Sequence, residues 1–170
     1  MSYIIVVAGH GAQVSFTGKK IMKFTSEEQQ IIRRAEAIIA SKLPATDYMN
    51  SPEMVRSFLR LHFAPAEREL FGVLFLDTQH GVIAFEELFQ GTIDACQVYV
   101  RIIAQKAMMH NARSVILVHN HPSMQAEPSA ADKAITLRIK AALGLVEVTV
   151  LDHLIVAGNN FTSFAESGLL

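Results

Sequence analysis

Apolar positions recur at helical spacing over two segments in the first third of the chain. The first segment begins with Thr25-Ser26-Glu27-Glu28, a capping box in which a hydroxyl and a carboxylate each bind the other residue's backbone amide. The second begins at Pro52, and proline is favoured at the first position of a helix because its missing amide is not needed there. Because proline interrupts helices, the pattern predicts two helices that end before Pro44 and Pro65.

After residue 70, short apolar runs alternate with helical segments. Continuous apolar runs at 71–76 and 114–118 are typical of strands buried on both faces, and turn residues lead from the first run into a hairpin partner at 82–85. Further strands are predicted at 146–151, 154–157 and 161–163, and helices at 98–110 and 129–143, the last of which ends at Gly144. This order predicts an α/β (α+β) fold with a mixed sheet flanked by helices.

Residues 1–21 carry glycines and a lysine pair around a short apolar run, unlike the rest of the chain. The segment fits either an edge strand or a disordered lead, and we expect it to be a dispensable extension. The sequence therefore divides into an N-terminal extension at 1–21, an N-terminal helical segment at 22–47 and one main domain at 48–170.

The composition narrows the functional classes. With 51% hydrophobic and 18% charged residues, the 170-residue chain has the content of a folded domain rather than of a disordered one. Its formal net charge is −1 without a dense basic stripe, so we do not expect direct binding to nucleic acid. Cys96 is the only cysteine, which excludes disulfides within the chain and cysteine-rich zinc sites. No segment has the features of a membrane span or a signal peptide, so we expect a soluble cytoplasmic protein without a membrane partner.

Three side chains that can bind a metal gather around one predicted strand end. His119 and His121 follow the strand at 114–118, and residues two apart on a strand point to the same face. Asp132 lies in the first turn of the next predicted helix, after a loop that lets it fold back. Two imidazoles and one carboxylate form a three-ligand zinc set that leaves a fourth position for water, which is the arrangement of catalytic zinc sites.

A water activated by zinc also needs a proton acceptor. Glu69, immediately before the strand predicted at 71–76, is the best candidate. If that strand runs antiparallel to the one at 114–118, the start of the first meets the end of the second. Glu69 would then lie near the two histidines.

Each of these residues also has an ordinary structural explanation. Ser129 fits the N-cap of the following helix, and Asp132 completes a capping box with it. Glu69 fits a solvated carboxylate at a strand end. Asp152-His153 fits either a pair that orients a metal ligand or a hydrogen-bonded turn between two strands. The two histidines favour the metal hypothesis, because a buried strand has no packing reason to end in imidazoles that need partners.

The spacing from His119-x-His121 through seven residues to Ser129, and through two more to Asp132, resembles the JAMM motif of the JAB/MPN metallopeptidases. Longer sequence segments resemble the RadC-like bacterial branch of that family, among them His119-Asn120-His121-Pro122-Ser123 and Leu151-Asp152-His153-Leu154-Ile155-Val156. The resemblance covers roughly residues 48–170.

The resemblance implies a JAB/MPN fold, similar to that of cytidine deaminases, and one Zn2+ ion per chain. It implies that His119, His121 and Asp132 are zinc ligands. It further implies that Glu69 is the general base and that Ser129 helps to hold the oxyanion of the tetrahedral intermediate. The implied reaction is hydrolysis of a peptide or isopeptide amide bond by a zinc metallopeptidase, with an unidentified protein or peptide as substrate.

Two departures from the RadC-like pattern bear on these expectations. Met124 stands where the branch usually has glycine, so we expect the loop backbone to differ there. Residues 1–47 show no match to the helix-hairpin-helix region that long RadC proteins carry. The alternative function, a DNA-repair-associated binding module in which zinc is structural or absent, is therefore less favoured than the hydrolase.

Overall fold

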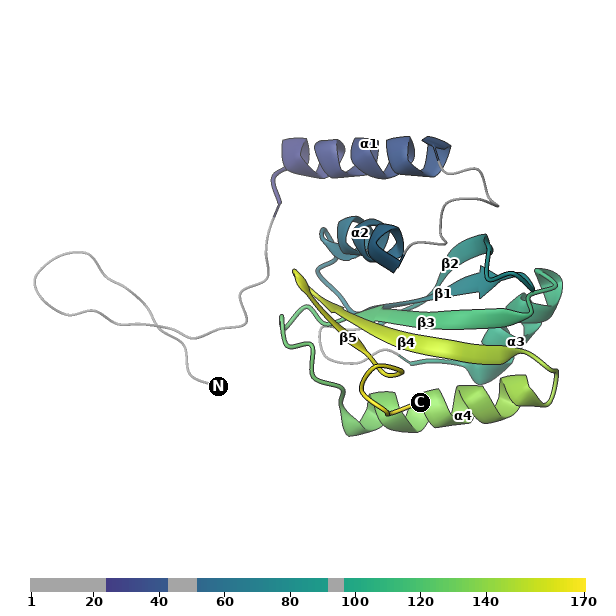
Figure 1. The fold of residues 1–170 in the computed structure, drawn as a ribbon. Helices are drawn as coiled ribbons and strands as arrows, with labels where there is room; N and C mark the ends of the chain where they lie inside the picture. Colours follow the sequence, from purple (N-terminus) through teal and green to yellow (C-terminus); the bar gives the residue numbers. More distant parts are fainter. Residues whose placement is uncertain (1–23, 43–51, 92–96) are drawn as a thin grey trace, which may run out of the picture.

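The computed structural model describes residues 24–42, 52–91 and 97–170, which form a mixed five-stranded sheet flanked by helices (Figure 1). This architecture confirms the predicted fold class. In chain order the elements are α1 Ser26–Lys42, α2 Pro52–Phe63, β1 Leu70–Leu76, β2 Val82–Gln90, α3 Val100–Met109, β3 Ser114–Asn120, α4 Ala130–Gly144, β4 Thr149–Ala157 and β5 Asn160–Ser163. The predicted extension at 1–21, the helix end at Pro44 and the lone Cys96 lie outside the described residues.

The strands follow the order β2-β1-β3-β4-β5 across the sheet. β1 and β2 form the predicted antiparallel hairpin, whose turn is held by Asp77 because its Oδ1 accepts the backbone amides of Gln79 and Gly81 at 2.8 Å each. β1 is also antiparallel to β3. β3 and β4 are parallel and are joined through α4 in a βαβ unit. The contact between β1 and β3 therefore joins the hairpin to the βαβ unit.

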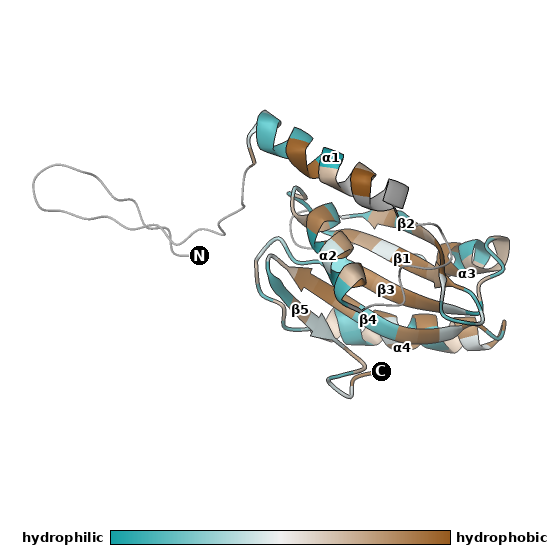
Figure 2. Cartoon of the chain, turned by 45° about the horizontal axis from the view of Figure 1, so that its top comes forward, coloured by the Kyte–Doolittle hydropathy of each residue, from teal (hydrophilic) through white to brown (hydrophobic). Residues whose placement is uncertain are grey.

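Helices lie on both faces of the sheet (Figure 1), and its central strands are largely hydrophobic (Figure 2). A hydrophobic core lies on each face. The core under α3 and α4 includes Phe71, Val73, Phe75, Ile103, Val115, Leu117, Ile139 and Leu143. The core under α2 includes Val55, Leu59, Phe63, Leu70, Leu74, Leu76, Val118, Leu154 and Val156. Alternate residues of β1 thus enter opposite cores, as the strand period of two requires. This explains why the sequence of β1 is hydrophobic throughout rather than alternating.

Both N-terminal helices begin where the sequence predicts. In the capping box of α1, the Thr25 amide donates to Glu28 Oε2 at 2.7 Å and the Glu28 amide donates to Thr25 Oγ1 at 3.2 Å. α2 packs on the sheet, whereas α1 lies over α2 on the side away from the sheet (Figure 1). Two isoleucines of α1, Ile31 and Ile38, are 63% and 52% exposed. Among the described residues no helix is long and apolar enough to cross a membrane.

Several predicted boundaries in the second half of the chain are wrong. β4 is one continuous strand from Thr149 to Ala157, because its pairing with β3 continues through Asp152-His153. The residues before it form a turn in which Glu147 has a left-handed φ of 58°, so the predicted strand start at 146 lies outside the sheet. The chain therefore leaves α4 through this turn, and Gly144 is the last helical residue rather than a stop after it.

The boundaries nearest the predicted metal ligands also shift. β3 extends to Asn120, two residues beyond its predicted end, so that His119 lies inside the strand and His121 immediately follows it. β2 extends to Gln90, past the predicted end of the hairpin at 85. Continued pairing accounts for the extra length, because β2 pairs with β1 as far as Gln90, whereas β3 pairs with β1 as far as His119 and with β4 as far as Asn120.

The loop between β3 and α4 contains a left-handed methionine. Met124 has φ of 61°, a conformation that glycine adopts freely but that costs other residues about 1–2 kcal/mol. Its sulfur lies against Gly158, where an added Cβ would come within 2.9 Å of Sδ. Met124 thus adopts a conformation that glycine takes freely, and the expected difference from a loop that contains glycine stays a prediction.

A candidate metal centre at the end of the central strands

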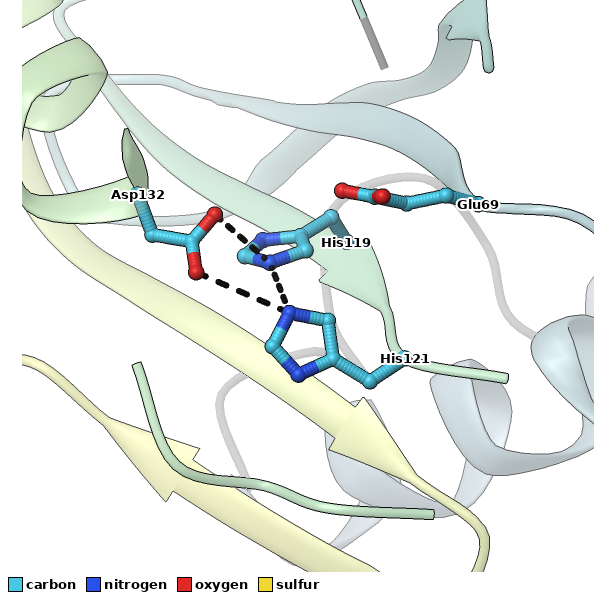
Figure 3. A group of neighbouring side chains, drawn as sticks. All are labelled: Glu69, His119, His121 and Asp132. Atoms are coloured by element: carbon cyan, nitrogen blue, oxygen red, sulfur yellow. Dashed lines mark hydrogen bonds and ion pairs between the residues drawn. The ribbon is translucent and has the colours of Figure 1, made fainter. Parts of the chain in front are cut away.

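Glu69, His119, His121 and Asp132 meet at one end of the sheet, where each offers a ligand atom within 4.8 Å of the others (Figure 3). The histidines come from the end of β3, Asp132 comes from the first turn of α4, and Glu69 precedes β1. In Figure 3, Asp132 and Glu69 approach His119 from opposite sides. The structure thus brings together the four residues for which the sequence suggested metal chemistry, and the cluster could hold a metal ion.

The antiparallel pairing of β1 with β3 explains how Glu69 reaches the histidines. Phe71 pairs with His119, so the residues just before β1 lie beside the end of β3. The ring of Phe71 also stacks on the His119 ring, with centroids 6.0 Å apart and planes inclined by 11°. The strand orientation on which the prediction for Glu69 depended is therefore confirmed.

A chain of hydrogen bonds behind His119 determines which of its nitrogens faces the cluster. The Asp132 carbonyl can only accept, so Thr136 Oγ1 donates to it at 2.5 Å. Thr136 must then accept from His153 Nδ1 at 2.6 Å, which leaves His153 Nε2 to accept from His119 Nδ1 at 2.8 Å. His119 therefore carries a proton on Nδ1, and Nε2 is the nitrogen that faces the cluster.

This assignment requires His153 to be neutral, and its surroundings keep it so. The residue is fully buried, and burial, reinforced by the neighbouring His119, holds the pKa of His153 well below its ordinary value. A neutral imidazole has one donor and one acceptor nitrogen, as the chain of hydrogen bonds demands.

His121 is oriented in the same way from the loop side. Its Nδ1 lies 2.7 Å from the Gln125 carbonyl, which can only accept, so Nδ1 donates and Nε2 faces the cluster. The Nε2 atoms of His119 and His121 lie 2.9 Å apart, and His119 Nε2 lies 3.2 Å from Asp132 Oδ1. Two lone pairs at this distance repel unless a cation lies between them. Ligand atoms of a tetrahedral zinc ion are about 3.3 Å apart, so the spacing suits such a cation.

In the metal-free protein a proton can lie between the Nε2 atoms of His119 and His121 in place of a metal ion. Burial lowers the pKa of His121, but the hydrogen bond to Asp132, the Gln125 carbonyl and the charges of Asp132 and Glu69 together raise it above the ordinary value of 6.5. His121 therefore retains a proton to higher pH than an exposed histidine does, and a metal ion must displace that proton.

Asp132 serves the helix and the cluster at once. Its Oδ2 accepts the Ser129 amide at 2.8 Å, and its own amide donates to Ser129 Oγ at 3.1 Å, which is the capping box that the sequence offered as the structural explanation. Burial raises the pKa of the Asp132 carboxyl, but hydrogen bonds from His119 and His121 outweigh burial and hold that pKa well below its ordinary range. The carboxylate is therefore charged, and its capping role does not exclude a ligand role.

Ser129 holds the Asp132 carboxylate in this arrangement. Its hydroxyl proton is donated to Asp132 Oδ2 at 2.6 Å. A hydroxyl has a single proton, so an interaction with an oxyanion requires it to rotate away from Asp132. The oxyanion role that the family resemblance implies for Ser129 stays a prediction.

Asp152 and His153 have different roles, which the sequence did not indicate. Asp152 Oδ1 accepts the amides of His153 and Ala165 at 2.7 and 2.9 Å, and its Oδ2 accepts the Ser163 hydroxyl at 2.6 Å. These bonds of Asp152 fix the chain after β5. The turn predicted as an alternative is wrong, because both residues lie inside β4, and His153 alone orients His119.

Sequence reasoning missed Thr136, which links Asp132 to His153. Its signal was available in the spacing, because Thr136 follows Asp132 by four residues and so lies one turn later on the same face of α4. A polar residue on a helix face that also supplies a metal-binding carboxylate is a candidate for supporting that site.

A cleft of about 760 Å³ opens beside the cluster, and Glu69, His121, Ser129 and Asp132 are among the residues that line it. Other lining residues come from α4, from the loop after β3 and from the segment before α3; they include Val98, Tyr99, Gln125, Glu127, Ile135 and Arg138.

The matches to known proteins agree with this geometry. A model described as the RadC-like JAB domain matches residues 49–169. A UPF0758 protein of Methylibium petroleiphilum is 49% identical over 145 residues, which cover 85% of this chain and 65% of that protein. A UPF0758 protein of Cellvibrio japonicus is 49% identical over 142 residues, covering 84% and 63%. One from Nitrosospira multiformis is 45% identical over 166 residues, covering 98% and 74%.

The chain spans slightly less than two thirds of the first two relatives. The region matched by the family model contains β1 to β5 and all four residues of the cluster. The resemblance read from the histidine and aspartate spacing is confirmed by these matches. The chain belongs to the RadC-like JAB domain family.

Proposed function

We propose that the protein is a zinc-dependent hydrolase of the JAMM type that cleaves a peptide or isopeptide amide bond. The observation that carries this proposal is the convergence of two imidazole Nε2 atoms, whose Nδ1 atoms are engaged by other hydrogen bonds, with a charged Asp132 and a second carboxylate, Glu69. Membership of the JAB domain family supports the same reaction class.

The donor set fits zinc better than it fits the harder divalent cations. Two imidazole nitrogens and one carboxylate are typical zinc ligands, whereas magnesium and calcium prefer oxygen alone. His119, His121 and Asp132 would hold the ion. When bound there, zinc supplies the Lewis acidity that polarises the scissile carbonyl and brings the pKa of a water towards about 7.

Glu69 would move the proton. It lies just before β1, whereas the histidines lie at the end of β3, and with three other ligands for the ion its carboxylate would bind the water. Its carboxylate accepts the proton that the attacking water loses and delivers it to the amine nitrogen as the C–N bond breaks. The cleft along α4 would hold the chain that carries this bond.

Replacing Glu69 tests the division of roles. Glu69→Gln keeps the shape of the side chain but removes the base, so the variant should retain one zinc per chain and lose at least about 100-fold in kcat. Metal content by elemental analysis and hydrolysis of a fluorogenic peptide that the wild type cleaves are measured on the same preparation. Cleavage by the variant at the wild-type rate would contradict the assignment.

Removing a ligand is the matched control. His119→Ala deletes one imidazole from the cluster and should lose zinc together with activity, whereas Glu69→Gln should lose activity alone. Equal zinc occupancy in His119→Ala and in the wild type would contradict the ligand set.

A further inference from the structure

The feature that carries a further inference is Asn120, which lies between the two histidines and is only 4% exposed. β3 stops pairing with β1 at the Phe71–His119 pair. Beyond it, the His121 amide donates to the Val156 carbonyl of β4 at 2.8 Å, so the backbone after β3 continues to bond to β4 and not to β1. The backbone groups at the start of β1 consequently need another partner.

The carboxamide of Asn120 supplies that partner. Its Oδ1 accepts the Leu70 amide at 2.7 Å, and its Nδ2 donates to the Arg68 carbonyl at 3.0 Å. Only one orientation of the amide group satisfies both bonds, because a carbonyl cannot donate and an amide hydrogen cannot accept. The side chain thus replaces the next rung of the β-ladder.

These two bonds bracket Glu69. Arg68 precedes it and Leu70 follows it, while the Glu69 carbonyl accepts the Gly91 amide at 2.8 Å from the end of β2. The backbone at Glu69 is therefore held between β2 on one side and Asn120 on the other. A side chain on a backbone fixed in this way has a restricted range of positions relative to the histidines.

We infer that Asn120 is a positioning residue for Glu69: by binding the backbone on both sides of Glu69, it fixes the carboxylate against the metal cluster. The inference rests on the proposed function, because it concerns the base of that reaction. Asn120 directs no polar atom to the metal ligands; its two hydrogen bonds both go to the strand that carries Glu69. Its replacement should therefore affect the base and spare metal binding.

Acetohydroxamate provides a probe that needs no knowledge of the substrate. Hydroxamates bind zinc hydrolases and transfer their proton to the adjacent base, so their affinity depends on where the base lies. Zinc affinity, measured by competition with a chelator, and acetohydroxamate affinity, measured by calorimetry on the zinc-loaded protein, separate the ligands from the base.

Asn120→Leu keeps a similar volume and removes both hydrogen bonds. We expect zinc affinity to stay within about twofold of the wild type and acetohydroxamate affinity to fall on the order of tenfold, the scale on which supporting residues act. Glu69→Gln should weaken acetohydroxamate at least as much. The double variant should be no weaker than Glu69→Gln alone, because Asn120 acts through Glu69.

Ser114→Ala is the matched control. Ser114 is buried at the opposite end of the same strand, and its hydroxyl makes no hydrogen bond with the described residues. It should leave both affinities unchanged. If Asn120→Leu does not fold, Asn120→Ala, which removes the same two bonds without adding an apolar group, replaces it.

The outcomes separate the two proposals. If wild-type protein binds neither zinc nor acetohydroxamate, the proposed function fails, and this inference fails with it. If the wild type binds both and Glu69→Gln weakens acetohydroxamate, the function stands, and an Asn120 variant with wild-type affinity would overturn the inference alone. An additive loss in the double variant, or a large loss of zinc affinity in the single one, would also overturn it.

Discussion

Helices α1 and α4 begin with the same local motif in different surroundings. In α1, Thr25 and Glu28 exchange hydrogen bonds at an exposed helix start, and these bonds with Thr25 lower the pKa of the Glu28 carboxyl. In α4, Ser129 and Asp132 make the equivalent bonds, but Asp132 is only 8% exposed and faces two histidines. The motif is therefore local in origin, whereas its use depends on what the sheet brings opposite it.

The comparison shows that a structural and a functional explanation of one residue can hold together. A carboxylate in a capping box is already charged, already oriented and already aligned with the positive end of a helix dipole. Placing it beside imidazoles adds a metal-binding function without a new backbone conformation. Within the described part of the chain, the corresponding carboxylate of α1, Glu28, bonds to Thr25 and acts as a cap.

Replacing the capping carboxylate of each helix should give the largest difference in zinc affinity between α4 and α1. Asp132→Asn keeps a capping acceptor but loses the charge, and zinc affinity should fall by more than about 100-fold, beyond the effect of supporting residues. Glu28→Gln makes the same chemical change in α1 and should leave zinc affinity unchanged. Chelator competition measures both, and equal affinities in the two variants would contradict a ligand role for Asp132.

The second difference is that the α4 motif has a supporting layer. Thr136→Val preserves shape but removes the acceptor for His153 Nδ1, so His153 no longer fixes the proton of His119. Zinc affinity should fall about 10–100-fold. Thr149→Val, at an exposed threonine of β4, is the control and should leave affinity unchanged. If the Thr136 variant bound zinc as tightly as the control, the claim that Thr136 and His153 fix the proton of His119 on Nδ1 would be contradicted.

The α4 site should also respond to pH. His121 has a raised pKa, so it is protonated below that value, and zinc must then displace a proton. Zinc affinity should accordingly fall as pH decreases, starting above 6.5, with a limiting slope of about tenfold per unit. Asp132 adds nothing to this slope because its pKa lies far lower. Calorimetry in two buffers of different ionisation enthalpy counts the released protons, and release of none at pH 6 would contradict the assignment.

The smallest effects should come from the capping hydroxyls. Thr25→Ala and Ser129→Ala each remove an N-cap acceptor and should cost about 1 kcal/mol of local helix stability. Hydrogen exchange of the first-turn amides of α1 and α4 reports this loss. Only Ser129→Ala should also weaken zinc binding, since Ser129 donates to Asp132 Oδ2. If the Thr25 variant weakened zinc equally, the two motifs would not be functionally distinct.

The sequence predicted those parts of the site that depend on short spacing. His119 and His121 share a strand end, and Asp132 follows within one loop, so alternation and a helix start were sufficient to group them. Glu69 could be placed only conditionally, because its position depends on how β1 pairs with a strand far along the chain. Fold class followed from the order of apolar runs in the same local way.

The remaining contacts depend on tertiary structure. The pattern around Asp152-His153 has two polar residues in an apolar run, which is also typical of a turn, and only pairing with β3 keeps the strand continuous. Asn120 gave no separate signal, because its partners, Arg68 and Leu70, lie 52 and 50 residues away in the chain. Hydrogen bonds between a side chain and a backbone group so far apart in the chain leave no periodic pattern in the sequence.

The βαβ unit formed by β3, α4 and β4 has a consequence for assembly of the centre. His119, His121, Asp132, Thr136 and His153 all belong to this one unit or to the loop within it. Glu69 comes from outside it, from the chain just before β1. The proposed ligand set and the proposed base therefore belong to different supersecondary units, and the pairing of β1 with β3 brings them together. A substitution that loosened this pairing would shift Glu69 relative to the histidines and leave the unit that carries them intact.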